Sequence, residues 1–405
     1  MRISTSTLYT NGVYGIQQQQ SAISQTQQDL SSGVKSPSED PVAAGQALVV
    51  SQASSINKQY ITGQNSANSR LSLNESVLQN VTSLIQNLQT QVVNAGNAAL
   101  SNSDRASIGT QIDSLNQQLV TLANTTDGTG VYLFSGGMGG TQPFQLTSTG
   151  AQYSGDQSKQ LAQIGPSQQV QVSLSGADVF QNIQTGNGFF VAQAASANTG
   201  TAAIDAGIVA NQTSWQASSK DYAIKFSVTA GTTSYNIVDN KTGQTVVASH
   251  PYTSGDAIQI GNTGSSVSIT GTPADGDTFT ITPSSKQSIF ATISNLVTAL
   301  NTPVSSASGN TSLTNTLKLA GQNLSSALNN ILTVRAANGS RLNEVTAAQS
   351  TSNNLSIQYQ TTLAQLQGVD YTQAISNLNQ ATLALQAAQK SFAQISNLSL
   401  FSYIQ

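Results

Sequence analysis

The clearest pattern of apolar positions lies near the C-terminal end of the chain, between residues 371 and 395. Apolar side chains recur there in alternating steps of three and four, which is the spacing of a coiled-coil seam and predicts a helix. The positions between them are mostly Gln, Asn, Ser and Thr. A polar helix with so narrow a seam is marginal alone and needs a partner. The seam consists of Tyr371, Ala374, Leu378, Ala381, Leu385, Ala388, Phe392 and Ile395.

A second seam of this kind lies near the N-terminal end. Its apolar residues recur every seven positions at Tyr9, Ile16, Ile23 and Leu30. The other seam positions are Val13, Gln20 and Gln27, so this helix is only half apolar. We therefore expect the two terminal helices to pair with each other and with neighbouring subunits, and to be disordered until neighbours cover them. An ordinary bundle inside one globular domain is the alternative that the pattern leaves open.

Helical periodicity continues inward from both ends. Gly33 is expected to end the first helix, since Pro37 cannot continue one. Asp40 followed by Pro41 is typical of an N-cap with proline at the first helical position, and predicts a long helix from residue 41. Ser103 and Asp104 predict the cap of the next helix. Further helices are expected over residues 108–122, 289–300 and 313–366.

The middle of the chain has a period of two, which predicts β-strands. Strands are expected at residues 131–134 and 222–228, with hairpins over 235–247 and 267–281, and a linker at 193–213. The fold class is thus mainly α with an inserted antiparallel β domain, the helical domains being discontinuous in sequence. The expected domains are a terminal coiled-coil domain (1–40 and 370–405), a helical bundle with a short β-hairpin (41–143 and 286–369) and an outer β-rich domain (144–285).

Composition excludes several classes of partner. Charged residues make up 8% of the chain, against about 25% in a typical soluble domain. The net charge is −3 and the basic residues are scattered, so no cationic surface for nucleic acid or anionic lipid is expected. No run approaches the ~18 apolar residues of a membrane span. Residues 1–30 lack the basic start and apolar core of a cleavable signal peptide.

Candidate chemistry is sparse. His250 is the single histidine, and a surface or turn position is favoured over a catalytic or metal-ligating one. Asp275 and Asp277 flank a glycine without the closing Glu of a calcium loop, which favours a plain turn. Trp215 is expected in a core. There is no cysteine. We expect no catalytic residue, no metal site and no cofactor, and hence no enzyme.

Motifs at both ends resemble one protein family. On the N-terminal side they are residues 1–5, Leu30-Ser31-Ser32-Gly33, the stretch 37–44, the stretch 124–136 and Pro143-Phe144. On the C-terminal side they are residues 334–343, Asp370-Tyr371 and residues 399–404. Together they resemble the flagellin-like axial proteins of the bacterial flagellum, over residues 1–144 and about 286–405. Ser340, where a small apolar residue is commoner, and the Gln-rich first seam depart from the pattern.

The resemblance implies a structural role, with site residues of two kinds. The implied subunit interface comprises Tyr9, Ile16, Ile23, Leu30, Leu378, Leu385, Phe392 and Ile395. The family motif comprises Gly33, Pro37, Asp40, Pro41, Arg335, Gly339, Arg341, Leu400 and Phe401. From the residues alone, Arg335 and Arg341 are expected either to snorkel at the surface or to contact a neighbouring subunit.

Within that family, the C-terminal motif at residues 399–404 and the pair Asp40-Pro41 resemble those of the members that join hook to filament. The resemblance implies a ring of identical subunits that contacts the first hook-associated protein and flagellin, and a cytoplasmic export chaperone. It also implies an extracellular position reached by flagellar type III export, without nucleic-acid binding or membrane insertion. The alternatives are a filament flagellin and a secreted coiled-coil, adhesin-like protein.

Overall fold

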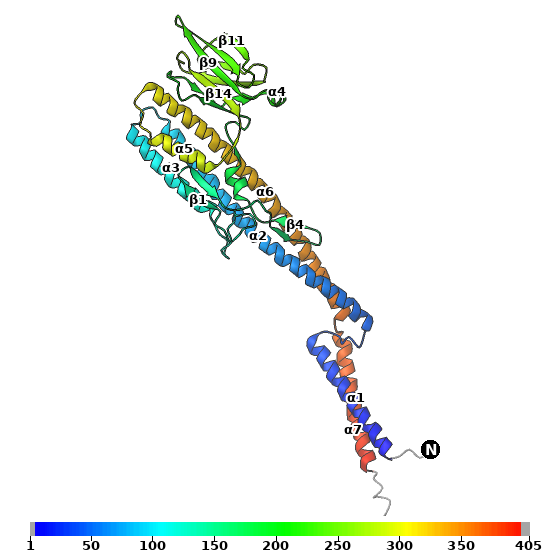
Figure 1. Cartoon of the computed structure of the whole chain (residues 1–405). Helices are drawn as coiled ribbons and strands as arrows, with labels where there is room; N and C mark the ends of the chain where they lie inside the picture. Colours follow the sequence, from blue (N-terminus) through cyan, green and yellow to red (C-terminus); the bar gives the residue numbers. More distant parts are fainter. Residues whose placement is uncertain (1–4, 398–405) are drawn as a thin grey trace, which may run out of the picture. The chain divides into compact units, whose positions relative to one another are not determined.

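The computed structural model of the protein describes residues 5–397, with the side chains of residue 7 and residues 9–394. The described chain is mainly helical with an antiparallel β insertion, as the sequence predicts (Figure 1). It divides into two compact units, Met1–Gly63 with Ala347–Gln405, and Gln64–Thr346. The helices are α1 (Thr5–Ser32), α2 (Pro41–Ala95), α3 (Asn102–Ala123), α4 (Gln212–Ala217), α5 (Ile289–Asn301), α6 (Ala307–Gln367) and α7 (Tyr371–Asn397).

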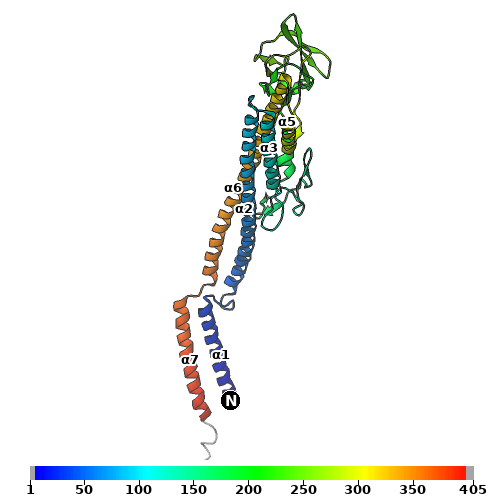
Figure 2. The same ribbon diagram turned by 90° about the vertical axis from the view of Figure 1, so that its left-hand side faces the viewer.

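The first unit holds both terminal helices. In both views α1 and α7 lie side by side (Figures 1 and 2). They are antiparallel, because the ring centroids of Tyr9 and Phe392 lie 4.9 Å apart and Val34 bridges Gly368 beyond the opposite ends. The predicted pairing of the terminal helices with each other is therefore confirmed. The start of α2 and the end of α6 belong to the same unit, where Asn57 Nδ2 donates to the Ser352 carbonyl at 2.7 Å.

The second unit contains a bundle of α2, α3, α5 and α6. The apolar residues of α2 that recur in steps of three and four are buried there, because this spacing places them on one face of the helix. The N-cap of α3 is Ser101, whose hydroxyl accepts from the Asp104 amide in a capping box, two residues before the predicted cap. The core includes Leu78, Val81, Ile85, Leu88, Val92, Ile112, Leu119, Ile293, Leu296, Leu324 and Ile331.

The β insertion divides between two cores. Its first part packs with the helices, since Phe144 and Phe180 are fully buried and the Phe144 ring lies 5.1 Å from that of Phe290. The strands are β1 (Phe144–Thr147), β2 (Gly150–Tyr153), β3 (Leu161–Gln163), β4 (Gln169–Gln171), β5 (Ile183–Gln184), β6 (Phe190–Ala194), β7 (Ala203–Ile204), β8 (Ile208–Val209), β9 (Tyr222–Thr229), β10 (Thr232–Asp239), β11 (Thr245–Pro251), β12 (Ala257–Gln259), β13 (Ser265–Thr270), β14 (Thr278–Pro283) and β15 (Lys286–Gln287).

The second part has a core of its own around Trp215, which is 1% exposed as expected. One sheet has the order β11-β10-β9-β14-β6, and a second has the order β12-β13-β7 with β8 also paired to β13. The stretch predicted to be a linker supplies β7 and β8, because Ile204 fills this core. The predicted boundary at residue 144 remains a prediction, although the first β segments share the helical core.

Two strand predictions are wrong. Residues 131–134 form turns with an isolated bridge between Thr126 and Tyr132. The hairpin expected over residues 267–281 does not form, because β13 and β14 belong to different sheets. Between them, the Asp277 carboxylate accepts from the amides of Thr199 and Gly200, so the turn is held to another segment. The hairpin over residues 235–247 is confirmed as β10 and β11.

Candidate assembly site

The seam between α1 and α7 is only half covered in the single chain. The half-buried apolar residues that face each other are Ile16, Ile23, Leu30, Leu378, Leu385 and Phe392. Tyr9 remains 55% exposed although its ring contacts Phe392. No apolar side chain described on α1 or α7 belongs to the buried core. Two helices alone leave much of each seam open to solvent, because the flanks of a pair are uncovered.

The second line of contacts on α1 differs from the prediction by one residue. Gln20 and Gln27 are exposed, whereas Gln19 and Thr26 are half-buried. Gln19 Nε2 donates to the Ala381 carbonyl at 3.2 Å. The half-buried positions 16, 19, 23, 26 and 30 keep steps of three and four, so the contact line lies on the other side of Ile16, Ile23 and Leu30 from the predicted one. The sequence pattern could not identify these polar contacts.

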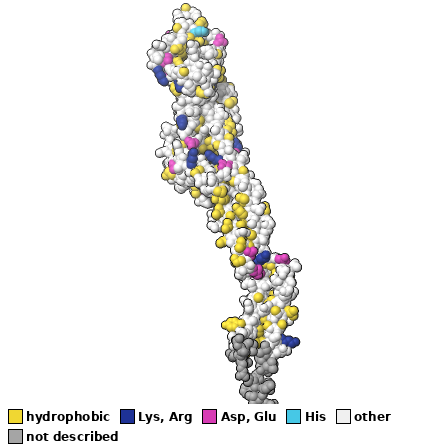
Figure 3. All heavy atoms as spheres, turned by 90° about the vertical axis from the view of Figure 1, so that its right-hand side faces the viewer, with side chains coloured by type: hydrophobic (Ala, Val, Ile, Leu, Met, Phe, Trp, Pro, Cys, Tyr) yellow, Lys and Arg dark blue, Asp and Glu magenta, His cyan; other side chains and the backbone are white. Residues whose placement is uncertain are grey.

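The described part of the first unit has almost no apolar core. Its buried apolar side chains are Ala47 and Ala348. By contrast, Val42, Val49 and Ile56 follow each other at seven-residue intervals on α2 and are 72%, 69% and 41% exposed. Figure 3 shows one face of the molecule, where apolar side chains lie uncovered among uncharged polar ones. The sequence predictions do not include these three residues, although their seven-residue spacing is present in the sequence.

Family-motif residues lie in two loops of the first unit that are hydrogen-bonded to each other. One loop joins α1 to α2 (residues 33–40) and the other joins α6 to α7 (residues 368–370). Gly33 has φ of +70°, a conformation that glycine adopts without strain. The Lys35 amide donates to the Gln367 carbonyl at 2.8 Å and the Val369 amide to the Gly33 carbonyl at 3.2 Å. These bonds tie the segment before α2 to the segment before α7. Pro37 is exposed between them.

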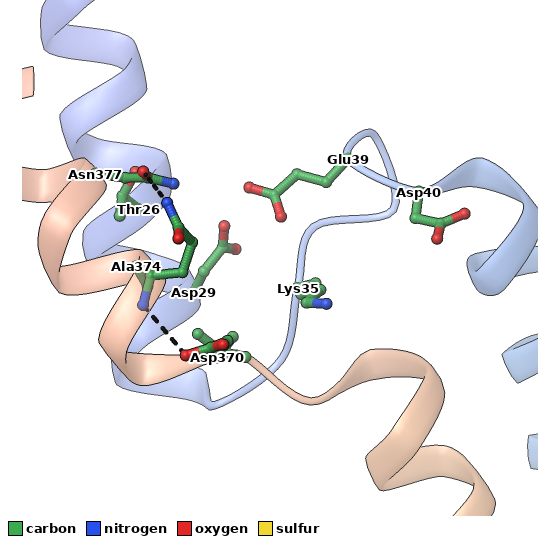
Figure 4. A pocket seen from close by; sticks show the side chains of 10 residues that line it. Thr26, Asp29, Lys35, Glu39, Asp40, Asp370, Ala374 and Asn377 are labelled. Atoms are coloured by element: carbon green, nitrogen blue, oxygen red, sulfur yellow. Dashed lines mark hydrogen bonds between the residues drawn. The ribbon is translucent and has the colours of Figure 1, made fainter.

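Each of these two loops ends in an aspartate whose carboxylate caps the helix that follows. Asp40 Oδ1 accepts from the Ala43 amide at 2.8 Å and so caps α2, whose first residue is Pro41 as predicted. Asp370 Oδ1 accepts from the Thr372 amide at 3.0 Å and caps α7. A cleft of about 470 Å³ lies beside these caps, between α1, α7 and the loop that precedes α2 (Figure 4).

The two family-motif arginines make contacts inside the second unit. Arg335 Nη2 lies 2.7 Å from Glu75 Oε1, and Arg341 Nη2 donates to Gln171 Oε1 at 3.2 Å. Burial lowers the pKa of the Arg341 guanidinium. In the single chain both arginines therefore make polar contacts within the chain, and a contact to a neighbouring subunit remains a prediction. Gly339 lies between them on α6 with open space around its α-carbon.

Residues considered for chemistry have structural positions in the described chain. His250 is exposed on β11, its ring centroid 5.2 Å from that of Tyr235. Asp275 accepts from the Val228 amide at 2.9 Å, and Asp277 fixes the turn before β14. Residues 5–397 contain no group of three or more potential metal ligands among His, Cys, Asp and Glu.

Three predicted site residues cannot be placed. Leu400 and Phe401 lie outside the described residues, and so does the side chain of Ile395. The motifs at residues 1–4 and 399–404 are outside them as well. Among the helices that the structure describes, none combines the length and apolarity needed to cross a bilayer.

Comparison with known proteins gives one consistent result. Residues 3–138 match the bacterial flagellin N-terminal helical region. Flagellar hook-associated protein 3 of Escherichia coli (strain K12) is 29% identical over 404 residues, which is 99% of each chain. The crystal structure of flagellar hook-associated protein-3 from Legionella pneumophila matches with 29% identity and a TM-score of 0.74, covering 78% of this chain and 98% of that one. The flagellar junction protein FlgL from Legionella pneumophila matches with 28% identity and a TM-score of 0.72, covering 80% and 100%.

Proposed function

Because the chain belongs to the flagellin-like axial proteins, in the family of flagellar hook-associated protein 3, we propose that it is a structural subunit of the junction between hook and filament. It works by packing helices against neighbouring subunits and not by catalysis. Its relatives are structural flagellar proteins. Filament flagellin is the weaker alternative, since the relative matched over 99% of both chains is a hook-associated protein.

The observation that carries the proposal is the missing core of the first unit. Its described residues bury only two apolar side chains, Ala47 and Ala348. A compact domain of this size normally buries a large apolar core to offset its conformational entropy. Neighbouring subunits would supply the missing cover along the α1–α7 seam and along Val42, Val49 and Ile56. Folding of the terminal helices is thus coupled to assembly.

The proposed partners follow from the family and from these surfaces. Identical subunits form a ring, with the first hook-associated protein on one side and flagellin on the other. The chain reaches the outside of the cell through flagellar export. A cytoplasmic chaperone covers the C-terminal helix before export, since the seam around Leu385 would otherwise drive premature association.

The test replaces two seam residues of α7, in the double variant Leu385→Ser and Phe392→Ser. Each fully buried Leu or Phe side chain contributes about 1.5–3 kcal/mol, so assembly should be lost. The fold of residues 64–346 should remain, because its core contains neither residue. Motility and filament attachment in cells measure assembly, and thermal unfolding of the purified chain measures the fold.

The matched control is the double variant Val93→Ser and Leu332→Ser. These side chains are 76% and 44% exposed and belong to the second unit. The control removes similar apolar groups and should leave both motility and unfolding temperature unchanged. Normal motility of the Leu385→Ser, Phe392→Ser variant would show that the seam does not serve assembly.

A further inference from the structure

The cleft beside the loops at residues 33–40 and 368–370 is lined by all four acidic residues of the first unit: Asp29, Glu39, Asp40 and Asp370. Asp40 and Asp370 are engaged as helix caps, with amide donors at 2.8 Å and 3.0 Å. The carboxylates of Asp29 and Glu39 cap no helix, and both are turned into the cleft (Figure 4). Two of the four negative charges therefore have no partner among the residues that the structure describes.

Asp29 is the more unusual of the two. It is 6% exposed, and no hydrogen bond to its carboxylate occurs among the described residues. It also lies in the last turn of α1, which ends at Ser32 and has no basic residue in that turn. A negative charge there meets the negative end of the helix dipole. An unpaired carboxylate in such a place is unfavourable, and a cationic group brought close to it would offset that cost.

Lys35 lines the cleft but does not neutralise it. The ion pair that the described residues form within 4.0 Å is Arg335 with Glu75, and Lys35 takes part in none. Four carboxylates and one ammonium leave a formal charge of −3 in the cleft. The described residues hold no metal-ligand group, and about 470 Å³ is far more than the ~30 Å³ share of one water molecule. This space fits a long cationic side chain better than a bare ion.

We propose that the cleft receives a lysine side chain, Lys58 or Lys390, from a second copy of the chain. These are the exposed lysines of the described first unit away from the cleft, and neither forms an ion pair there. Lys58 follows Pro41 by 17 positions, about 26 Å along a helix, and Lys390 follows Asp370 by 20 positions, about 30 Å. Neither can reach the cleft of its own chain, whereas a neighbouring copy can bring one there.

The inference rests on the self-assembly proposed above, and the full-length chain tests both. Asp29→Asn should raise the unfolding temperature of the monomer, because it removes an unpaired negative charge from the last turn of α1. The same variant should weaken self-association at low salt by about tenfold, because it removes a charge-assisted pair. Glu344→Gln makes the same change of charge at an exposed position of α6 and should alter neither quantity. Analytical ultracentrifugation measures the association.

Cross-linking identifies the lysine, since the chain has no cysteine of its own. A chain with Glu39→Cys is mixed with a chain carrying Lys58→Cys or Lys390→Cys, and a short bis-maleimide is added. One mixture should give a cross-linked heterodimer and the other should not.

Three results would overturn the inference. If wild type associates but Asp29→Asn associates equally well, self-assembly stands and the lysine contact is wrong. If wild type does not associate at all, both proposals fail. If magnesium or calcium chloride stabilises monomeric wild type but not Asp29→Asn, the cleft binds an inorganic cation instead.

Discussion

One carboxylate oxygen of Asp127 holds residues 127–131 in a turn, directly before residues 131–134, where the sequence predicted a strand. Asp127 Oδ1 accepts from the Thr129 amide at 2.9 Å, the Thr129 hydroxyl at 2.6 Å and the Val131 amide at 3.0 Å. The hydroxyl of Thr129 is the main reason that the pKa of Asp127 lies below its usual value. Such local side-chain bonds compete with regular secondary structure. Leu133 and Phe134 can then enter the helical core from a turn.

Asp127→Ala should lower the free energy of unfolding by about 1–3 kcal/mol at pH 7, since hydrogen bonds to a charged group are lost. The folded-state pKa is depressed, so the contribution is complete above the unfolded value near 3.8 and disappears as the pH falls through the folded value. The difference between wild type and variant should therefore be constant from pH 7 to about pH 5 and shrink below about pH 4.

Urea unfolding across this pH range measures the effect. Glu344→Ala serves as control, because Glu344 is exposed on α6 and its removal should change stability little. A difference that grows below pH 4 would contradict the assigned role of the carboxylate.

At the scale of elements, the contact between α1 and α7 depends on small residues as well as apolar ones. A β-carbon added at Gly12 would lie 2.8 Å from Cδ2 of Phe392, whereas one added at Gly15 would meet nothing within 4 Å. The two glycines are one turn apart on the same helix. The close approach at Gly12 lets the Phe392 ring lie against α1 beside Tyr9.

These glycines give a matched pair of variants. Gly15→Ala should stabilise α1 by about 0.5–1 kcal/mol, because alanine loses less backbone entropy in a helix. Gly12→Ala gains the same helix propensity but must displace the Phe392 ring, so its net effect should be smaller or negative. Helicity by circular dichroism and amide exchange in α7 measure the pairing. Equal stabilisation by the two variants would show that the ring is not packed against Gly12.

At the scale of the whole molecule, apolar burial is unevenly divided. The second unit has two separate cores, one among the helices and one around Trp215. The chain enters and leaves the latter through β5 and β15, where Gln184 is the antiparallel partner of Lys286. Side chains on α6 add hydrogen bonds, with Asn315 accepting from Ile204 at 3.0 Å and Asn323 from Gly186 at 2.8 Å.

Replacing residues 185–285 by a short Gly-Ser linker should therefore leave the helical core folded. The ends to be joined are adjacent strands, roughly 5 Å apart, and the helical core uses none of the deleted side chains. Loss of the four hydrogen bonds that α6 makes with Gly186, Ala202 and Ile204 should cost about 1 kcal/mol each. Thermal unfolding and limited proteolysis test this, and export and ring formation should persist in cells. A variant that is degraded or molten would show that the helices depend on the β region.

The helices and the pairing of the chain's two ends follow from the amino-acid sequence alone. Helical period, the Asp40 cap and the prolines are local signals, and local interactions fix where a helix begins and which face is apolar. The same signals found the β10–β11 hairpin, whose turn joins adjacent strands. For the candidate site, the helical period predicted the residues of α7 that are half-buried against α1. The role of these residues in assembly remains a prediction.

Which distant segments share a core depends on tertiary contacts that no local pattern predicts. The separation of β13 from β14, the use of residues 144–183 by the helical core and the burial of Ile204 depend on contacts far apart in sequence. The contacts of Gln19 and the burial of Asp29 are of the same kind. A residue's neighbours along the chain set its conformation, but its burial and partners depend on what packs across from it, and no local pattern encodes that.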